Sequence, residues 1–249
     1  MDYKKSVITQ PLTKIKDIET LVGKDVEYTF YKEVNSTTMR IAVKKLASYI
    51  DMNLLERDLK ENKLSVMTAE AKIWMQYGTS LGEQFEKNYW KNSVYATGRM
   101  DTVRYERPVN YQIAKNKNIV WISGKMDIID HTNKEIIELK TSQGKTYGNF
   151  ARDLRQAYLY KIMLEKEDVK YKDYKVVVLV YYKNYAELGM KSGFVRYVVD
   201  LEYEDEEQRN RCIKFDKEIR EHYKKVFETV LNFWDTKQQA IKEIVKKYE

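Results

Sequence analysis

Residues 119–140 decide the fold: Ile119-Val-Trp-Ile-Ser-Gly-Lys-Met-Asp-Ile-Ile-Asp-His-Thr-Asn-Lys-Glu-Ile-Ile-Glu-Leu-Lys140. Two apolar runs flank a polar turn at residues 130–134, so we predict a β-hairpin. Because side chains alternate along a strand, Glu138 and Lys140 lie on the same face. A hairpin can bring Asp127 beside that face. Two carboxylates and an ammonium would then converge, which is the chemistry of a hydrolase that uses a hard divalent cation.

The surrounding sequence predicts an α/β fold with a mixed central sheet flanked by helices. Alternating or continuous apolar patterns predict strands at residues 103–113, 119–130, 135–140, 174–182 and 193–201, the first three as an antiparallel meander. A helix is predicted at about residues 149–165. The tail at residues 204–248 is interpreted as one or two amphipathic helices, which pack on the sheet through Ile213, Ile219, Val226, Val230, Phe233 and Trp234.

Residues 1–65 are interpreted as a mainly helical N-terminal region, followed by a second region at residues 66–249 that carries the sheet and the C-terminal helices. Thr37 or Thr38 is expected to cap a helix. Its apolar positions, at three- and four-residue steps, are Val43, Leu46, Ala47, Ile50 and Leu54. A further helix is predicted at about residues 68–90.

Composition narrows the class of protein. The 249 residues, 43% of them hydrophobic, suffice for a sizeable core, and no apolar run reaches membrane-spanning length. No hydrophobic signal core follows the first residues, so we expect a cytoplasmic protein without membrane association. Cys212 is the only cysteine, which excludes an internal disulfide and a four-cysteine iron–sulfur cluster within one chain. The net charge of +7 fits a phosphate-rich partner, although lysine-rich proteins often show such an excess without one.

Three short motifs follow one another along the chain: Gly-x-x-Asp, Glu-x-Lys-Thr and Gln-x-x-x-Tyr. They are formed by Gly124 and Asp127, then Glu138, Lys140 and Thr141, then Gln156 and Tyr160. In this order, over about residues 70–185, they resemble the PD-(D/E)XK nuclease superfamily. The RecB-type branch, with its CRISPR-adaptation nucleases and phage recombination exonucleases, is the most similar. The resemblance implies a restriction-endonuclease-like core.

The resemblance also implies a deoxyribonuclease that depends on Mg²⁺ or Mn²⁺. Asp127 and Glu138 would hold the ion, with the carbonyl of Leu139 as a further ligand. Lys140 would position the attacking water or stabilise charge on the phosphate. Gln156 is expected to orient that water or support the ligands. Tyr160, one turn along the helix, would support Gln156.

DNA is the expected partner, as single or double strands. Arg152 and Arg155 lie on the same predicted helix as the Gln-x-x-x-Tyr motif and are candidates for bidentate contacts with phosphates. Thr141, next to the motif lysine, is assigned to the same surface.

One position departs from the branch, which usually carries Gly-x-x-x-His or Gly-x-x-x-Glu on an upstream helix, with a metal ligand at its end. Here Gly78 begins the motif and Gly82, which has no side chain, occupies the ligand position. We expect Glu83 to replace the missing ligand. The alternatives are water and Glu86, which lies one turn along from Gly82. The number of bound ions, one or two, therefore stays open.

Three functional classes follow from these residues. The leading class is a metal-dependent DNA nuclease that acts on ends or single strands in recombination or repair. The second class is a nucleic-acid-binding subunit that has lost catalysis, and Gly82 is the one feature that favours it. The third is a site-specific endonuclease, and the Gln-x-x-x-Tyr helix argues against it. An alternative interpretation is that Glu138 and Lys140 form an ordinary surface ion pair. In this interpretation Asp127 caps the hairpin. An inward carboxylate pair argues against that reading, because it must be neutralised.

Overall fold

The computed structural model describes residues 26–63, 65–67, 103–142, 147–182, 186–187, 189–190 and 193–248. Contacts divide the chain into two compact units, residues 1–28 with 64–101, and residues 29–63 with 102–249. In the first unit, β1 (Val26–Tyr28) pairs antiparallel with β4 (Ser65–Met67). The second unit carries the predicted sheet and is described by itself below.

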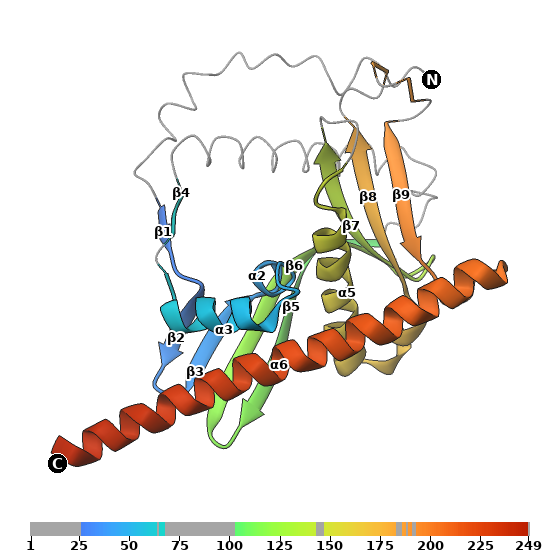
Figure 1. Ribbon diagram of the computed structural model, residues 1–249. Coiled ribbons are helices and arrows are strands. Elements are labelled where there is room, and N and C mark those ends of the chain that lie inside the picture. Colours follow the sequence, from blue (N-terminus) through green and yellow to red (C-terminus); the bar gives the residue numbers. More distant parts are fainter. Residues whose placement is uncertain are drawn as a thin grey trace. The chain divides into compact units, whose positions relative to one another are not determined.

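The second unit is built on a seven-stranded mixed sheet (Figure 1). Its strands are β2 (Tyr31–Asn35), β3 (Thr38–Ala42), β5 (Val103–Lys115), β6 (Asn118–Asp130), β7 (Glu135–Ser142), β8 (Lys175–Tyr182) and β9 (Phe194–Val199). They follow the order β2-β3-β6-β7-β8-β9, and β5 also pairs with β6. The β3–β6 and β7–β8 pairs are parallel and the others antiparallel. The predicted meander and the two later strands are confirmed.

The strand patterns follow from burial. Along β6, Val120, Ile122, Met126 and Ile128 are buried at even positions, as expected for a strand with one face on the core. In β8, residues 176–180 are all buried, which is typical of a strand covered on both faces. The fold is therefore a mixed α/β sheet flanked by helices, in agreement with the expected restriction-endonuclease-like core.

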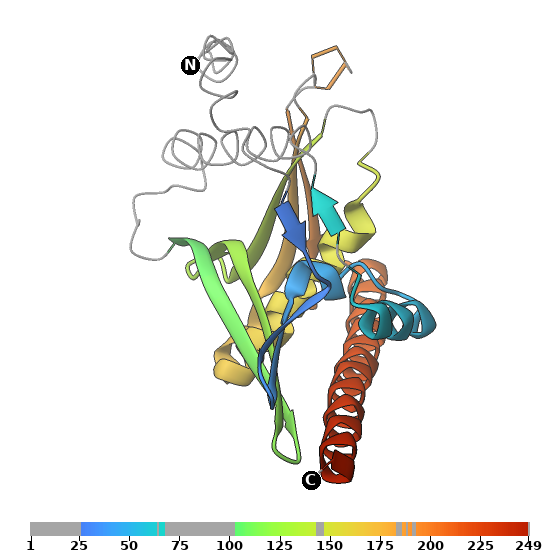
Figure 2. The ribbon, with the colours of Figure 1, turned by 90° about the vertical axis from the view of Figure 1, so that its left-hand side faces the viewer.

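Helices cover this sheet. They are α2 (Val43–Leu46), α3 (Met52–Glu61), α5 (Phe150–Glu167), the short 3₁₀ helix η2 (Val169–Asp173) and α6 (Glu206–Tyr248). The α5 helix packs against β7 and β8, whereas α6 contacts α3, α5 and the β5–β6 hairpin. Figure 2 shows that α6 is one continuous helix, so the C-terminal tail forms one helix rather than two. Among the helices of the described residues, none is both long and apolar enough to cross a membrane.

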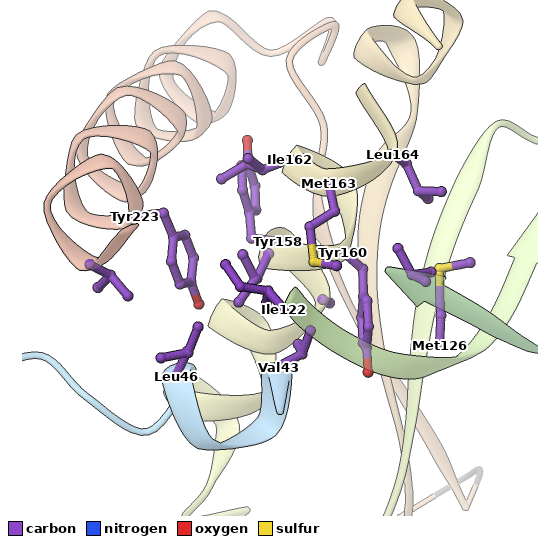
Figure 3. Close-up of a cluster of buried hydrophobic side chains, with 14 of the residues drawn as sticks. Val43, Leu46, Ile122, Met126, Tyr158, Tyr160, Ile162, Met163, Leu164 and Tyr223 are labelled. Carbon is purple, nitrogen blue, oxygen red and sulfur yellow. The ribbon is translucent and has the colours of Figure 1, made fainter. Parts of the chain in front are cut away.

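The core forms where these helices meet the sheet. Figure 3 shows Tyr158 of α5, Ile122 of β6 and Val43 of α2 converging, with Tyr223 of α6 beside them, and all four are buried. The Tyr223 hydroxyl donates to the Arg155 carbonyl at 2.7 Å. The same core therefore holds α5 between the sheet and α6.

The prediction of a helix beginning after Thr37 or Thr38 is wrong. Thr38 begins β3, in which Met39 and Ile41 are buried and Arg40 is exposed. This alternation is typical of a strand, and β3 pairs in parallel with β6. Residues 29–63 thus add two strands to the sheet and are not mainly helical.

The apolar residues chosen for that helix belong to different elements. Val43, Leu46 and Ala47 are buried at the single turn of α2, whereas Ile50 is 71% and Leu54 45% exposed. Asp51 starts a new helix, since its carboxylate accepts from the Asn53 backbone N–H at 2.8 Å. In that helix Leu55 and Leu59 face the core instead.

One predicted contact of α6 is also wrong. Ile213 is 48% exposed. The Phe215 ring packs on Tyr158, and two residues of helix rotate a side chain by about 200°, so Ile213 faces away. The other predicted contacts are buried or partly buried: Ile219, Val226, Val230, Phe233 and Trp234.

The predicted helix at residues 68–90 lies outside the described residues. The division of the chain between residues 65 and 66 falls within β4 and stays a prediction.

Candidate active site

The site forms where β6 changes its partner along one edge. Residues 119–123 pair with β3 and residues 128–130 with β7, while β5 follows the opposite edge. Residues 124–127 lie in the fork between β3 and β7, where no described strand pairs with this edge of β6, so its backbone groups need other partners. The Tyr160 hydroxyl donates to the Lys125 carbonyl at 2.9 Å. The fork thus opens the sheet beside the Gly-x-x-Asp motif.

Three predicted site residues converge at this fork. The Lys140 ammonium is bonded to Glu138 Oε1 and lies 3.6 Å from Asp127 Oδ2. Asp127 Oδ2 also accepts from the Leu139 backbone N–H at 2.8 Å, which joins β6 to β7 within the fork. Asp127 and Glu138 therefore share the ammonium of Lys140, and this convergence agrees with the hairpin predicted from the sequence.

Burial and the neighbouring charges shift the pKa values of Glu138 and Lys140. Glu138 is 1% exposed, and burial together with the Asp127 charge raises its pKa to about 8, although Lys140 opposes the shift. Burial alone would lower the pKa of Lys140, but the two carboxylates outweigh it and raise that pKa. Two acids thus compete for one ammonium.

The chemistry of the Glu138 carboxylate would suit a divalent cation. Lys140 and Gln156 both donate to Glu138 Oε1, the amide at 2.6 Å. Glu138 Oε2 is buried, and no group of the described residues forms a hydrogen bond with it. A buried carboxylate oxygen without a partner is costly, and carboxylate oxygens are the ligands that Mg²⁺ and Mn²⁺ prefer.

The helix α5 supplies the third motif. Gln156 and Tyr160 lie one turn apart and face the fork, where Gln156 contacts Glu138 and Tyr160 contacts the β6 backbone. Figure 3 shows Tyr160 reaching from α5 beside β6. The motif glutamine therefore holds a carboxylate, and the tyrosine supports the strand that carries Asp127.

The structure explains why glycine stands at position 124. A Cβ atom there would lie 2.5 Å from the Tyr160 hydroxyl oxygen and 3.0 Å from Val43 Cβ. Real Cβ contacts are rarely so short, and Tyr160 is buried in the core with little room to move. Glycine is required here by the close approach of α5.

We expect Gly124→Ala to destabilise the protein by about 1–3 kcal/mol, because overpacking must displace Tyr160. Gly148→Ala is the control, since a Cβ there would have nothing within 4 Å. That control should stay within about 0.5 kcal/mol of the wild type. Urea unfolding followed by circular dichroism measures both, and equal stability of the two variants would contradict the close approach.

The three residues assigned to DNA have different surroundings. Arg155 Nε donates to the Ala47 carbonyl at 2.9 Å, and burial lowers the pKa of Arg155, so this side chain ties α5 to the end of α2. Arg152 is partly exposed, and its Nε donates to Asp153 at 3.1 Å. Alternation places Thr141 on the face opposite Glu138. Their contacts with DNA remain predictions.

Sequence reasoning missed two residues near the site. Asp153 is 1% exposed and accepts a hydrogen bond from the Tyr147 hydroxyl. Asp153, Gln156 and Tyr160 occur at positions i, i+3 and i+7, which is one stripe of a helix. This spacing is the signal by which Asp153 could have been found.

The predicted ligand Glu83, its alternative Glu86 and the departing Gly82 all lie outside the described residues. Within the described part of the chain, no group of three or more His, Cys, Asp or Glu side chains is placed to hold one metal ion. The predicted ligands that fall within the described residues are thus Asp127, Glu138 and the Leu139 carbonyl.

No family model matches this sequence, and no curated protein is significantly similar to it. Solved structures with some likeness include the crystal structure of SSO0001, at 18% identity and a TM-score of 0.43, covering 82% of this chain and 83% of that chain. Another is a phage-related exonuclease from Haemophilus somnus 129PT, at 15% identity and a TM-score of 0.32, covering 67% and 73% of the two chains.

Proposed function

We propose that this protein is a DNA nuclease that depends on Mg²⁺ or Mn²⁺ and hydrolyses phosphodiester bonds at ends or in single strands. One observation carries the proposal: Asp127, Glu138 and Lys140 meet at the fork of β6, where a buried oxygen of Glu138 has no partner among the described residues. Buried Glu135 has such an oxygen too, so what distinguishes Glu138 is that a second carboxylate, Asp127, lies beside the same ammonium. The motif order supports the same chemistry and the setting of recombination or repair.

Asp127 and Glu138 would hold the ion, with the Leu139 carbonyl and Glu83 as further proposed ligands. A bound ion supplies Lewis acidity to the scissile phosphate and lowers the pKa of a water. The protein's contribution is the arrangement of its ligands. Lys140 and Gln156 both donate to Glu138 Oε1, which leaves Oε2 to bind the ion.

Lys140 has a second role in this proposal. Its ammonium lies between the two carboxylates, and its pKa is raised, so it stays charged. A charged group fixed at this point stabilises negative charge as it develops on the phosphate, or holds the attacking water. Asp127 is held at the same time by the Leu139 N–H, so neither carboxylate needs to reorganise.

We expect cleavage to require Mg²⁺ or Mn²⁺ and to stop when EDTA is added, because the two carboxylates otherwise repel the phosphate. Purified protein is incubated with linear and circular DNA, each single- and double-stranded, and products are resolved on denaturing gels. Loss of linear but not circular DNA would identify an exonuclease. Cleavage of circles at defined positions would favour a site-specific endonuclease.

Full cleavage in metal-free buffer would contradict the proposed mechanism. Binding of DNA without cleavage under every metal condition would instead favour the non-catalytic subunit.

A further inference from the structure

Asp153 forms a buried cluster with two neighbours. Its Oδ2 accepts from the Tyr147 hydroxyl, and its Oδ1 accepts from Arg152 Nε at 3.1 Å. The carboxylate is 1% exposed, whereas the Arg152 side chain is 33% exposed. A buried anion thus fixes a cation that reaches solvent.

The cluster lies next to the candidate active site. Asp153 is one turn before Gln156 on the stripe of α5 that faces Glu138. Its charge also contributes to raising the pKa of both Glu138 and Lys140. Asp153 nevertheless forms no three-carboxylate metal group with Asp127 and Glu138 in the described residues. Its contacts point toward Arg152 instead.

A simpler role does not explain these contacts. An acid in the first turn of a helix is stabilised by the helix dipole, but that effect operates at the surface and needs no burial. The contact through Nε fixes the plane of the Arg152 guanidinium. It leaves the two terminal nitrogens outside this bond, and these nitrogens can bind a phosphate in a bidentate manner.

We infer that Asp153 and Tyr147 are positioning residues that hold Arg152 for contact with a DNA phosphate beside the cleavage site. This inference rests on the proposed function for its ligand. Fixing the side chain in advance removes part of the entropy that a long arginine otherwise loses on binding. Asp153 then affects DNA affinity only through Arg152.

A double-mutant cycle tests this dependence. Affinity for a fluorescein-labelled single-stranded oligonucleotide is measured by anisotropy in EDTA, for Arg152→Ala, Asp153→Asn and the double variant. We expect Arg152→Ala to weaken binding about tenfold, since a hydrogen bond to a charged group contributes about 1.5–3 kcal/mol. Asp153→Asn should weaken binding about threefold or more, for the same reason of lost positioning. It should have no effect when Arg152 is already alanine.

Two further measurements separate positioning from stability. The slope of log affinity against log salt should fall by about 0.7 in Arg152→Ala, the value for one lost phosphate contact on a single strand. Tyr147→Phe keeps the Asp153 charge, and it should weaken binding only while Arg152 is present. Melting temperatures show that each variant is folded under the binding conditions.

The chain contains a matched control on α3. Asp58 accepts from the Tyr49 hydroxyl and, at 3.0 Å, from both Nε and Nη2 of Arg57, so the same three residue types meet, with one more contact from the arginine. The pair Arg57→Ala and Asp58→Asn should leave DNA affinity unchanged. Equal coupling at both clusters would overturn the inference, because it would show a general effect of charge.

Additive losses from Arg152→Ala and Asp153→Asn would also overturn it, as would an absence of DNA binding by the wild-type protein. Cleavage is assayed separately with Mg²⁺. A wild-type protein that binds DNA but does not cut it would refute the proposed nuclease and leave the cycle interpretable.

Discussion

Glu138→Gln is expected to abolish DNA cleavage while the variant still folds and binds DNA. The amide has nearly the same shape and keeps an oxygen, but it lacks the charge that a hard cation requires. Loss of a residue that only supports a metal ligand costs about 10–100-fold in activity, so loss of a ligand should cost at least about 100-fold. Initial rates with Mg²⁺ measure this loss.

The fold should tolerate this change. Burial raises the pKa of Glu138 to about 8, so the ionised side chain is disfavoured where it stands and a neutral amide removes that cost. The melting temperature in EDTA should therefore stay equal or rise. DNA affinity should also be retained, because a negative charge is removed from beside the phosphate.

Glu135→Gln is the matched control. Glu135 lies on the same strand, is also buried and is also paired with a cation, Arg196. Its Oε2, too, has no hydrogen-bond partner among the described residues. Alternation places it on the opposite face of the sheet from Glu138. This control should cleave DNA at close to the wild-type rate. Equal loss in both variants, or full activity in Glu138→Gln, would show that Glu138 is not a ligand.

The hairpin could be predicted from the sequence because its signals are local. Alternating apolar residues define β6, the turn at residues 130–134 separates it from β7, and side-chain alternation places Glu138 and Lys140 together. A helix of suitable length follows, and its Gln156 needs only to reach the nearest strand. The site was predictable to the extent that one hairpin and one helix form it.

Residues 31–46 were misread because two periods overlap. Met39 and Ile41 alternate as a strand, but Val43, Leu46 and Ala47 continue with helical spacing. The spacing is real, yet it belongs to one turn of helix between β3 and the capped start of α3. The parallel pairing of β3 with β6 decides that residues 38–42 form a strand. It joins residues about 80 positions apart and leaves no local signal.

The role of Gly124 also needed the structure. From the sequence, the residue belongs to a motif; in the fold, the Tyr160 ring occupies the space of its missing side chain. The fork in β6 is equally invisible in the sequence, because it depends on which strands pair with its two halves. Long-range pairing thus fixes the part of the site that spacing could not.

The opposite side of α5 carries a charge that sequence alone would place in solvent. Lys161 is 2% exposed, although lysine is rarely buried without a partner. Its ammonium donates to the Tyr174 carbonyl at 2.6 Å and lies 3.9 Å from Glu165 Oε1. Glu165 in turn binds Arg220 of α6 through both carboxylate oxygens, at 2.6 and 2.8 Å. This network fixes α5, and with it Gln156, between the sheet and α6.

We expect Glu165→Ala to destabilise the protein by about 3 kcal/mol, measured by urea unfolding. Removing one member of a buried ion pair costs about 3–5 kcal/mol, because the remaining charge is buried without compensation. The lower end applies here, since Arg220 is partly exposed and keeps Asp216 as a partner, so that most of the loss comes from Lys161.

The control Glu207→Ala removes a glutamate from α6 whose pair with Arg211 is exposed on both sides. Such pairs contribute about 0–1 kcal/mol, so this variant should unfold close to the wild type. If Glu165→Ala lost no more stability than Glu207→Ala, Lys161 would have to be neutral or solvated in the folded protein. The network would then not be what holds α5 in place, and the position of Gln156 beside Glu138 would depend on the apolar core alone.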